Sequence, residues 1–191
     1  MDTPTPRIDP SAIQIPTVSP TIVTPGPPSS SPGPSDVEAT YRLGTTLFAS
    51  GDVERSRLAL ERAVQLDPRN AKSYFGLGTA LVKLDRVQEA VRCFEQAATL
   101  LPADADFRLA LGLAYARANR VADSVASYEA AITLGRRDPD TYMNLGAQLD
   151  KLGHGERAVA CLLEALRLRA DHVPTHKHLA AAYGRLGRYA E

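Results

Sequence analysis

Three closely spaced histidines, His172, His176 and His178, are the residues whose types and spacing first suggest chemistry. Neutral imidazoles four positions apart on a helix share one face and can bind one metal ion. His172, however, precedes Pro174 and falls outside the helix expected here, and His178 points to a different face from His176. No nearby cysteine or carboxylate completes a set of four ligands, so we expect neither a metal nor a cofactor.

The two cysteines, Cys93 and Cys161, are 68 residues apart, which is twice the repeat length described below. They therefore belong to helical units that are not neighbours, and packed helices lie about 8 to 10 Å apart. A disulfide needs Cα atoms closer than about 7 Å, so we expect two buried free thiols. Nucleophile-elbow, phosphate-binding and metalloprotease motifs are also missing from the sequence, and we expect no enzymatic activity.

Four cations, Lys83, Arg117, Lys151 and Arg185, recur at intervals of 34 residues. One cation in each repeated unit forms a ladder, and such a ladder can steer an acidic segment towards the protein. The alternative is that each cation only occupies a solvated helix end, where a positive charge interacts favourably with the helix dipole. The sequence leaves both interpretations open.

The 34-residue spacing extends through most of the chain. Its clearest column is a leucine followed by a glycine, with a large apolar residue three positions later, which predicts one buried stripe on a first helix. A second helix then carries a small residue, a large apolar residue and an alanine, which allow close helix packing. The columns are Leu43-Gly44, Leu77-Gly78, Leu111-Gly112, Leu145-Gly146 and Leu179-Ala180; Leu47, Leu81, Tyr115, Leu149 and Tyr183; Ser56, Ala90, Ser124 and Ala158; Leu60, Phe94, Tyr128 and Leu162; and Ala63, Ala97, Ala131 and Ala165.

Residue types that favour tight turns separate the two helices of each unit. This column contains Gly51, Asp85, Asn119, Gly153 and Gly187. Pro68 and Pro102 follow the first two units and end their second helices. Pro139 and Pro174 suit the first turn of the helices that follow, and Asp138 is placed to cap one of them.

The period, the Leu-Gly pair and the later Ala, Phe and Pro columns resemble the tetratricopeptide repeat (TPR) family, although the tryptophan of that family is missing. The resemblance covers residues 37–191 and implies an all-α fold, a right-handed superhelical solenoid of antiparallel helix hairpins. The expected repeats are 37–70, 71–104, 105–138 and 139–172, with a partial repeat 173–191. The expected helices are 37–50, 53–66, 71–84, 87–100, 105–118, 121–134, 139–152, 155–168 and 173–186.

The first 36 residues differ in composition from the rest, because they contain ten of the 14 prolines. Such a stretch cannot sustain the hydrogen bonding of a helix or a sheet, so we expect a disordered Pro/Ser-rich arm over residues 1–36. Isoleucines and valines in this arm could dock in a groove of the array. Its Ser-Pro and Thr-Pro steps and its one PxxP pattern could serve as modification or recognition sites.

The formal net charge of zero argues against broad electrostatic attraction to nucleic acid or to an anionic membrane. The sequence contains no run of 18 apolar residues, and residues 1–16 lack the pattern of a secretory signal. We therefore expect no nucleic-acid binding, no membrane insertion and a cytoplasmic location.

In the family that the chain resembles, the first helices line a concave side on which partner segments bind. Carried over column by column, this implies a mainly apolar groove with cations along one edge. The implied groove residues are Tyr41, Arg42, Thr45, Phe48, Lys72, Phe75, Thr79, Val82, Lys83, Leu109, Ala110, Leu113, Arg117, Met143, Asn144, Ala147, Lys151, Lys177, His178 and Arg185. The clamp with which some members grip a terminal carboxylate is not matched, because Tyr41, Phe75 and Ala110 stand at its columns. The alternative is that the apolar residues only pack within or between hairpins.

These patterns predict a protein-interaction adaptor or scaffold, which binds an apolar or amphipathic and in part acidic segment of another protein. The partial repeat stops where its second helix should begin, and this motivates two alternatives. The chain could be the substrate-recruiting part of a larger enzyme or secretion machine, or it could self-associate through this repeat. A chaperone for a secreted subunit is a third alternative.

Overall fold

The computed structural model describes residues 33–187, so the predicted arm 1–36 lies outside the described residues except for its last four. The described part folds into helices joined by short turns. Their bounds are α1 Pro34–Ala49, α2 Val53–Leu66, α3 Ala71–Lys83, α4 Val87–Leu100, α5 Ala105–Arg117, α6 Val121–Thr133, α7 Pro139–Lys151, α8 Gly155–Leu168 and α9 Val173–Arg185.

The expected helix bounds are confirmed to within one residue, with the exception of the start of α1. This helix begins at Pro34, three residues earlier than expected. Proline is tolerated at the first helical position because its missing amide has no partner there in any case. The Asp36 carboxylate also accepts a hydrogen bond from the amide of Gly33 at 3.1 Å, which satisfies a free donor ahead of the first turn.

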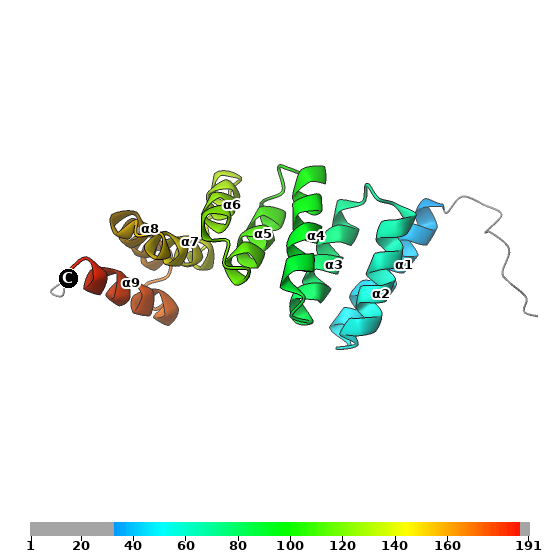
Figure 1. Cartoon of the computed structure of the whole chain (residues 1–191), viewed down its shortest axis with the longest axis horizontal. Helices are drawn as coiled ribbons and strands as arrows, with labels where there is room; N and C mark the ends of the chain where they lie inside the picture. The colour runs from blue at the N-terminus through cyan, green and yellow to red at the C-terminus, as the bar shows by residue number, and fades with distance from the viewer. Residues whose placement is uncertain (1–32, 188–191) are drawn as a thin grey trace, which may run out of the picture. The chain divides into compact units, whose positions relative to one another are not determined.

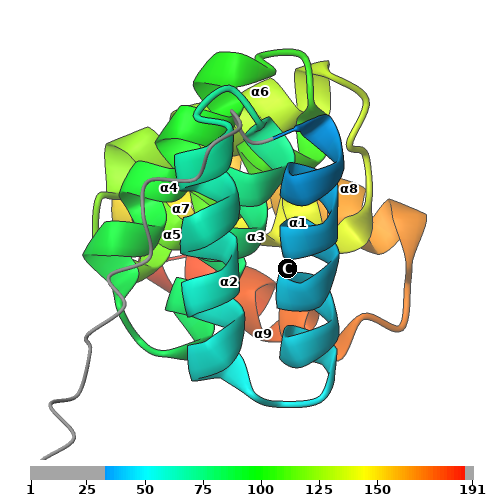
Figure 2. The same ribbon diagram turned by 90° about the vertical axis from the view of Figure 1, so that its right-hand side faces the viewer.

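Consecutive helices pair into antiparallel hairpins, α1 with α2, α3 with α4, α5 with α6 and α7 with α8. Each second helix also packs on the first helix of the next unit, and α9 packs on α8 and α7. Figure 1 shows the hairpins following one another in a row, with α9 running across the direction of α1 and α2. Figure 2 looks along this row from the side of α1. The predicted all-α solenoid is therefore confirmed for the described residues.

Glycines on the first helices let the second helices approach closely. A methyl group added at Gly112 would lie 2.8 Å from the ring of Tyr128, a residue only 1 % exposed. The hydroxyl of Ser124 donates a hydrogen bond to the carbonyl of Gly112 at 2.8 Å, and Ser56 makes the equivalent bond to Gly44 at 2.7 Å. The predicted columns of glycine, small residue and large apolar residue therefore form the contact inside each hairpin.

The residues of the predicted turn column have a left-handed backbone conformation. Asp85 and Asn119 have φ values of 59° and 58°, and the glycines of this column also have positive φ. Asp138 caps α7 as predicted, because its carboxylate accepts the amide of Thr141 at 3.0 Å. Pro139 is the first residue of that helix.

The predicted buried stripe of first helices is wrong in the first unit. Leu77, Leu111 and Leu145 are at most 7 % exposed, whereas Leu43 is 54 % exposed. In the later units, the first helices α3, α5 and α7 pack on the second helix of the preceding unit, whereas no helix precedes α1 among the described residues. Burial of this leucine therefore depends on a preceding unit, and the repeat pattern of one unit does not show whether such a unit is present.

Candidate functional site

Three aromatic side chains, Phe75 on α3, Phe94 on α4 and Phe107 on α5, form one cluster. The ring of Phe75 stacks on that of Phe107, with centroids 4.9 Å apart, and meets that of Phe94 edge-on at 5.6 Å. Phe94 and Phe107 are buried, but Phe75 is only partly buried. Phe75 therefore contributes to the core and to the surface above it, so both interpretations offered by the sequence apply to it.

Three small neighbouring pockets are each lined by at least one ring of this cluster. The first has a volume of about 160 Å³ and lies between α1 and α3. The second and third, of about 210 and 350 Å³, lie between α3 and α5. Thr79 lines the first two pockets, and Ala110 and Leu113 line the last two. The pockets therefore adjoin, and we call them together the groove.

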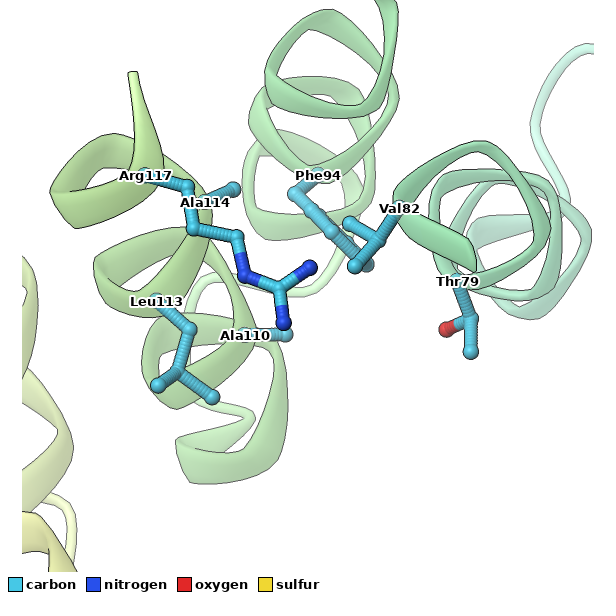
Figure 3. A pocket seen from close by; sticks show the side chains of 7 residues that line it. All are labelled: Thr79, Val82, Phe94, Ala110, Leu113, Ala114 and Arg117. Atoms are coloured by element: carbon cyan, nitrogen blue, oxygen red, sulfur yellow. The ribbon is translucent and has the colours of Figure 1, made fainter. Parts of the chain in front are cut away.

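The second pocket is almost entirely apolar (Figure 3). Val82 and Phe94 form one side, and Leu113 projects from α5 on the other. Arg117 extends its side chain across the pocket, so that its guanidinium group lies over the apolar floor and faces α3. Leu113 is 43 % exposed even though it lies among apolar neighbours. This pocket can hold one apolar side chain beneath a positive charge.

The structure brings half of the predicted groove residues together at these pockets, namely Tyr41, Thr45, Phe48, Phe75, Thr79, Val82, Leu109, Ala110, Leu113 and Arg117. Met143 instead packs on the buried residues Val159, Leu162 and Ala182 between α7, α8 and α9, as the alternative interpretation held. Asn144 and Ala147 are partly buried on α7, while Lys72, Lys83, Lys151, Lys177 and His178 are exposed. Arg42 is exposed and pairs with Glu38 at 2.7 Å.

Sequence reasoning missed residues that reach the pockets from below or from the side: Leu60, Gly76, Phe94, Asp104, Asp106, Phe107 and Ala114. Leu60 and Phe94 belong to second helices, whereas the resemblance directs attention to first helices alone. Their column of large residues was visible in the sequence, and its contact with glycine explains how these side chains reach the groove.

The predicted cationic ladder loses one member. Nε of Arg185 donates to Oδ1 of Asp150 at 2.8 Å, and its Nη2 contacts Oδ2 of the same carboxylate. Asp150 is 9 % exposed, and its charge neutralises that of Arg185. Lys83, Arg117 and Lys151 have no ion-pair partner among residues 33–187. Three cations of the ladder therefore remain available to a ligand.

Two of the three closely spaced histidines, His172 and His176, make contacts within the last two units. His172 is 7 % exposed, with Nδ1 2.5 Å from Oγ1 of Thr175 and Nε2 3.1 Å from Oδ1 of Asp140. Nε2 of His176 lies 2.8 Å from the carbonyl oxygen of Ala170, and His178 is exposed. Among the described residues, no cluster of His, Cys, Asp and Glu side chains is arranged to hold a metal ion.

The two cysteines are free thiols, as predicted, and both are partly buried. Burial raises the pKa of Cys93 to about 11, and it also raises the pKa of Cys161. Both side chains are therefore protonated at neutral pH, and a thiol in that form is a poor nucleophile.

None of the helices described is long and apolar enough to cross a membrane.

Comparisons with known proteins agree with this architecture. A tetratricopeptide repeat family model matches residues 30–71, 41–91 and 75–140, and a second model of the same repeat matches residues 139–172. Comparison with curated protein sequences gives no match.

Several solved structures share the fold. MamA from Desulfovibrio magneticus has a TM-score of 0.76 at 18% identity, covering 80% of this chain and 86% of its own. YrrB, described as a TPR protein with an unusual peptide-binding site, has a TM-score of 0.76 at 19% identity, covering 81% of this chain and 80% of its own. Identities this low establish the fold alone. Together with the family matches over most of the array, they lead to one conclusion: the chain belongs to the tetratricopeptide repeat family.

Proposed function

We propose that the protein is an adaptor whose groove binds an apolar or amphipathic segment of another protein. The observation that carries the proposal is the set of adjoining apolar pockets on α1, α3 and α5, with Leu113 exposed between two of them. Exposed apolar patches and preformed apolar pockets are typical binding sites, because a partner that buries them removes apolar surface from water. YrrB, which shares the fold, is described as having a peptide-binding site.

The chemistry of the groove supports binding and not turnover. Its lining is mainly apolar and aromatic, with Thr79 and Arg117 as the polar members of the second pocket. Asp104 and Asp106 line the third pocket, but Asp104 caps α5 and Asp106 pairs with Arg136. A catalytic site needs a nucleophile or a general base held within hydrogen-bonding reach of a reacting atom. The proposal therefore assigns the array no catalysis of its own.

A peptide-library selection with Leu113→Ser tests this proposal. Peptides enriched on the full-length wild-type chain should bind the variant at least about tenfold more weakly, because a buried leucine contributes roughly 1.5 to 3 kcal/mol. Leu113 is suited to the test because its exposure of 43 % lets it be replaced without opening the core.

Leu163→Ser is the matched control. Leu163 is 46 % exposed on α8, a second helix, and lines none of the three groove pockets. Peptides that bind this variant and the wild type equally, but not Leu113→Ser, support the groove. Equal binding to all three proteins, or no enrichment on the wild type, counts against it.

A further inference from the structure

We infer that the groove selects an extended, polyproline-II-like segment in which a carboxylate and a large apolar side chain each recur at every third residue, and that Arg117 binds one of these carboxylates above the second pocket. This inference rests on the proposed function and narrows it to one class of ligand. It follows from the position of Arg117, from the unpaired cations on either side of it, and from the distance between neighbouring units.

Arg117 is placed to bind an anion that comes from outside the chain. Some of the other arginines pair with carboxylates of the array, for example Arg120 with Asp123 at 2.7 Å and Arg157 with Glu129 at 2.5 Å. The side chain of Arg117 forms no ion pair or hydrogen bond with any described residue. Its guanidinium group instead lies over the apolar second pocket (Figure 3). Guanidinium groups are weakly hydrated, and a carboxylate held beside an apolar floor would be shielded from competing water.

The acidic residues near the groove are already engaged. Asp106 lines the third pocket, and its Oδ1 forms an ion pair with Nη1 of Arg136 at 2.6 Å. Asp104 lines the same pocket and accepts hydrogen bonds from the amides of Asp106 and Phe107 at the start of α5. These carboxylates therefore have partners of their own, and the charge of Arg117 is left uncompensated.

Lys83 and Lys151 extend the positive charge by one unit on each side of Arg117. They occupy the same column on α3 and α7, and neither has an ion-pair partner among the described residues. Arg185, the next member of the column, is neutralised by Asp150. The positive stretch therefore covers three consecutive units and ends before α9.

The spacing of these cations indicates the conformation of the ligand. The stacked rings of Phe75 on α3 and Phe107 on α5 connect two successive first helices, so their cations are one helix diameter, roughly 10 Å, apart. A polyproline-II segment rises about 3.1 Å per residue with three residues per turn, so residues i and i+3 lie on one side about 9 Å apart. Carboxylates at every third residue would meet successive cations, while the apolar residues beside them would face the pockets.

Fluorescence anisotropy with the full-length chain tests this inference. The probe is a labelled peptide of four Pro-Glu-Leu repeats, with its amino end acetylated and its carboxyl end amidated so that no terminal carboxylate contributes. One control peptide replaces every glutamate by glutamine, and a second replaces every leucine by serine. We expect the acidic peptide to bind, and each control peptide to bind at least fivefold more weakly.

Arg117→Met keeps the stem of the side chain and removes its charge. Affinity for the acidic peptide should fall about fivefold, the upper range for a single exposed ion pair, and affinity for the glutamine peptide should not change. Arg92→Met is the matched control, because Arg92 is exposed on α4 and lines none of the groove pockets. Added salt should weaken binding of the acidic peptide to the wild type more than to Arg117→Met.

Different results overturn the inference and the proposed function. If the acidic and glutamine peptides bind equally, or if Arg117→Met weakens both to the same extent, the ligand class is wrong while the groove remains a binding site. If the acidic peptide does not bind at all, the inference also fails, and the library selection with Leu113→Ser then decides the groove function separately. Circular-dichroism melting curves for each variant exclude loss of fold as the cause.

Discussion

At the scale of single residues, the stability of the array depends on two columns of residues that tolerate few substitutions. The glycine column of the first helices lies beneath large side chains of the second helices, and the turn column adopts a left-handed conformation that few residue types tolerate. Both columns are visible in the sequence. Their physical effects differ, because the first concerns space and the second concerns backbone conformation.

Gly112→Ala should destabilise the fold by about 1 to 3 kcal/mol, because the new methyl group would lie 2.8 Å from the buried ring of Tyr128. In an exposed helix the same change would stabilise by up to about 1 kcal/mol, so the sign of the effect is diagnostic. Urea unfolding measures it. In a Tyr128→Ala background the added methyl group has room, and its cost should largely disappear; an unchanged cost in that background would contradict the explanation.

Asp85→Gly should stabilise the protein by about 0.5 kcal/mol, because Asp85 has a φ of 59° and glycine adopts this conformation without steric cost. Gly153→Ala, at the same column with a φ of 80°, should instead destabilise by about 1 kcal/mol. Thermal melts compare the two variants with the wild type. Shifts of the two melting temperatures in the same direction would show that φ does not control stability at this column.

Asp138 should make stability depend on pH in the acidic range. Burial alone would raise the pKa of its carboxyl group, but hydrogen bonds from the amide and hydroxyl of Thr141 and from Arg136 together lower this pKa. A lowered folded-state pKa gives stability that is complete above the unfolded value of about 3.9 and is lost as the pH falls below it. The difference in unfolding free energy between wild type and Asp138→Asn should therefore shrink from pH 6 to pH 3. A constant difference over this range would exclude the effect.

At the scale of elements, each helix is held mainly by its neighbours, and the contacts between units differ from one junction to the next. Units two and three are joined by Tyr115, which donates to Glu95 at 2.7 Å beneath the guanidinium of Arg120. Burial is the main cause that raises the pKa of Tyr115 to about 12, and the hydrogen bond to Glu95 is the second. The phenol therefore stays protonated at neutral pH and donates this hydrogen bond. The last junction uses the pair of Asp150 on α7 and Arg185 on α9 instead.

Arg185→Met should loosen α9 more than Asp150→Asn does, even though both remove the same ion pair. Asp150 is 9 % exposed, so removal of Arg185 leaves a buried carboxylate without its partner, at a cost of about 1 to 2 kcal/mol. Hydrogen exchange of the α9 amides measures the effect. Arg167→Met, which removes an exposed pair within α8, is the control and should change exchange little. Equal effects of Arg185→Met and Asp150→Asn would argue against a cost from the unpaired carboxylate.

At the scale of the whole molecule, the described array is a row in which stability is a sum of hairpins and junctions. Among the described helices, those in the middle of the row pack on helices on both sides, whereas α1 packs mainly on α2 and, less extensively, on α3. The groove lies on α1, α3 and α5, so ligand binding should stabilise one half of the row more than the other.

Native-state hydrogen exchange should therefore vary along the row. Amides of α4 and α5 should exchange most slowly, and those of α1 and α9 most quickly. Addition of the acidic Pro-Glu-Leu peptide should slow exchange in α3 and α5, while exchange in α8 and α9 stays unchanged. Uniform protection of all helices would instead show that the array unfolds as one cooperative unit.

The sequence by itself determined the turn residues, the family and the helix bounds other than the start of α1, because these follow from contacts within one unit that recur every 34 residues. Only the tertiary structure showed that Leu43 is exposed, that Arg185 pairs with Asp150 and that Met143 packs against the buried residues between α7, α8 and α9. It also placed Phe94, from a second helix, in the pocket beneath Arg117. The physical reason is that a repeat records the interactions each unit has in common, whereas these four features depend on which side chains of different helices meet. The groove combines both, because its columns recur but the charge that is left unpaired at Arg117 does not.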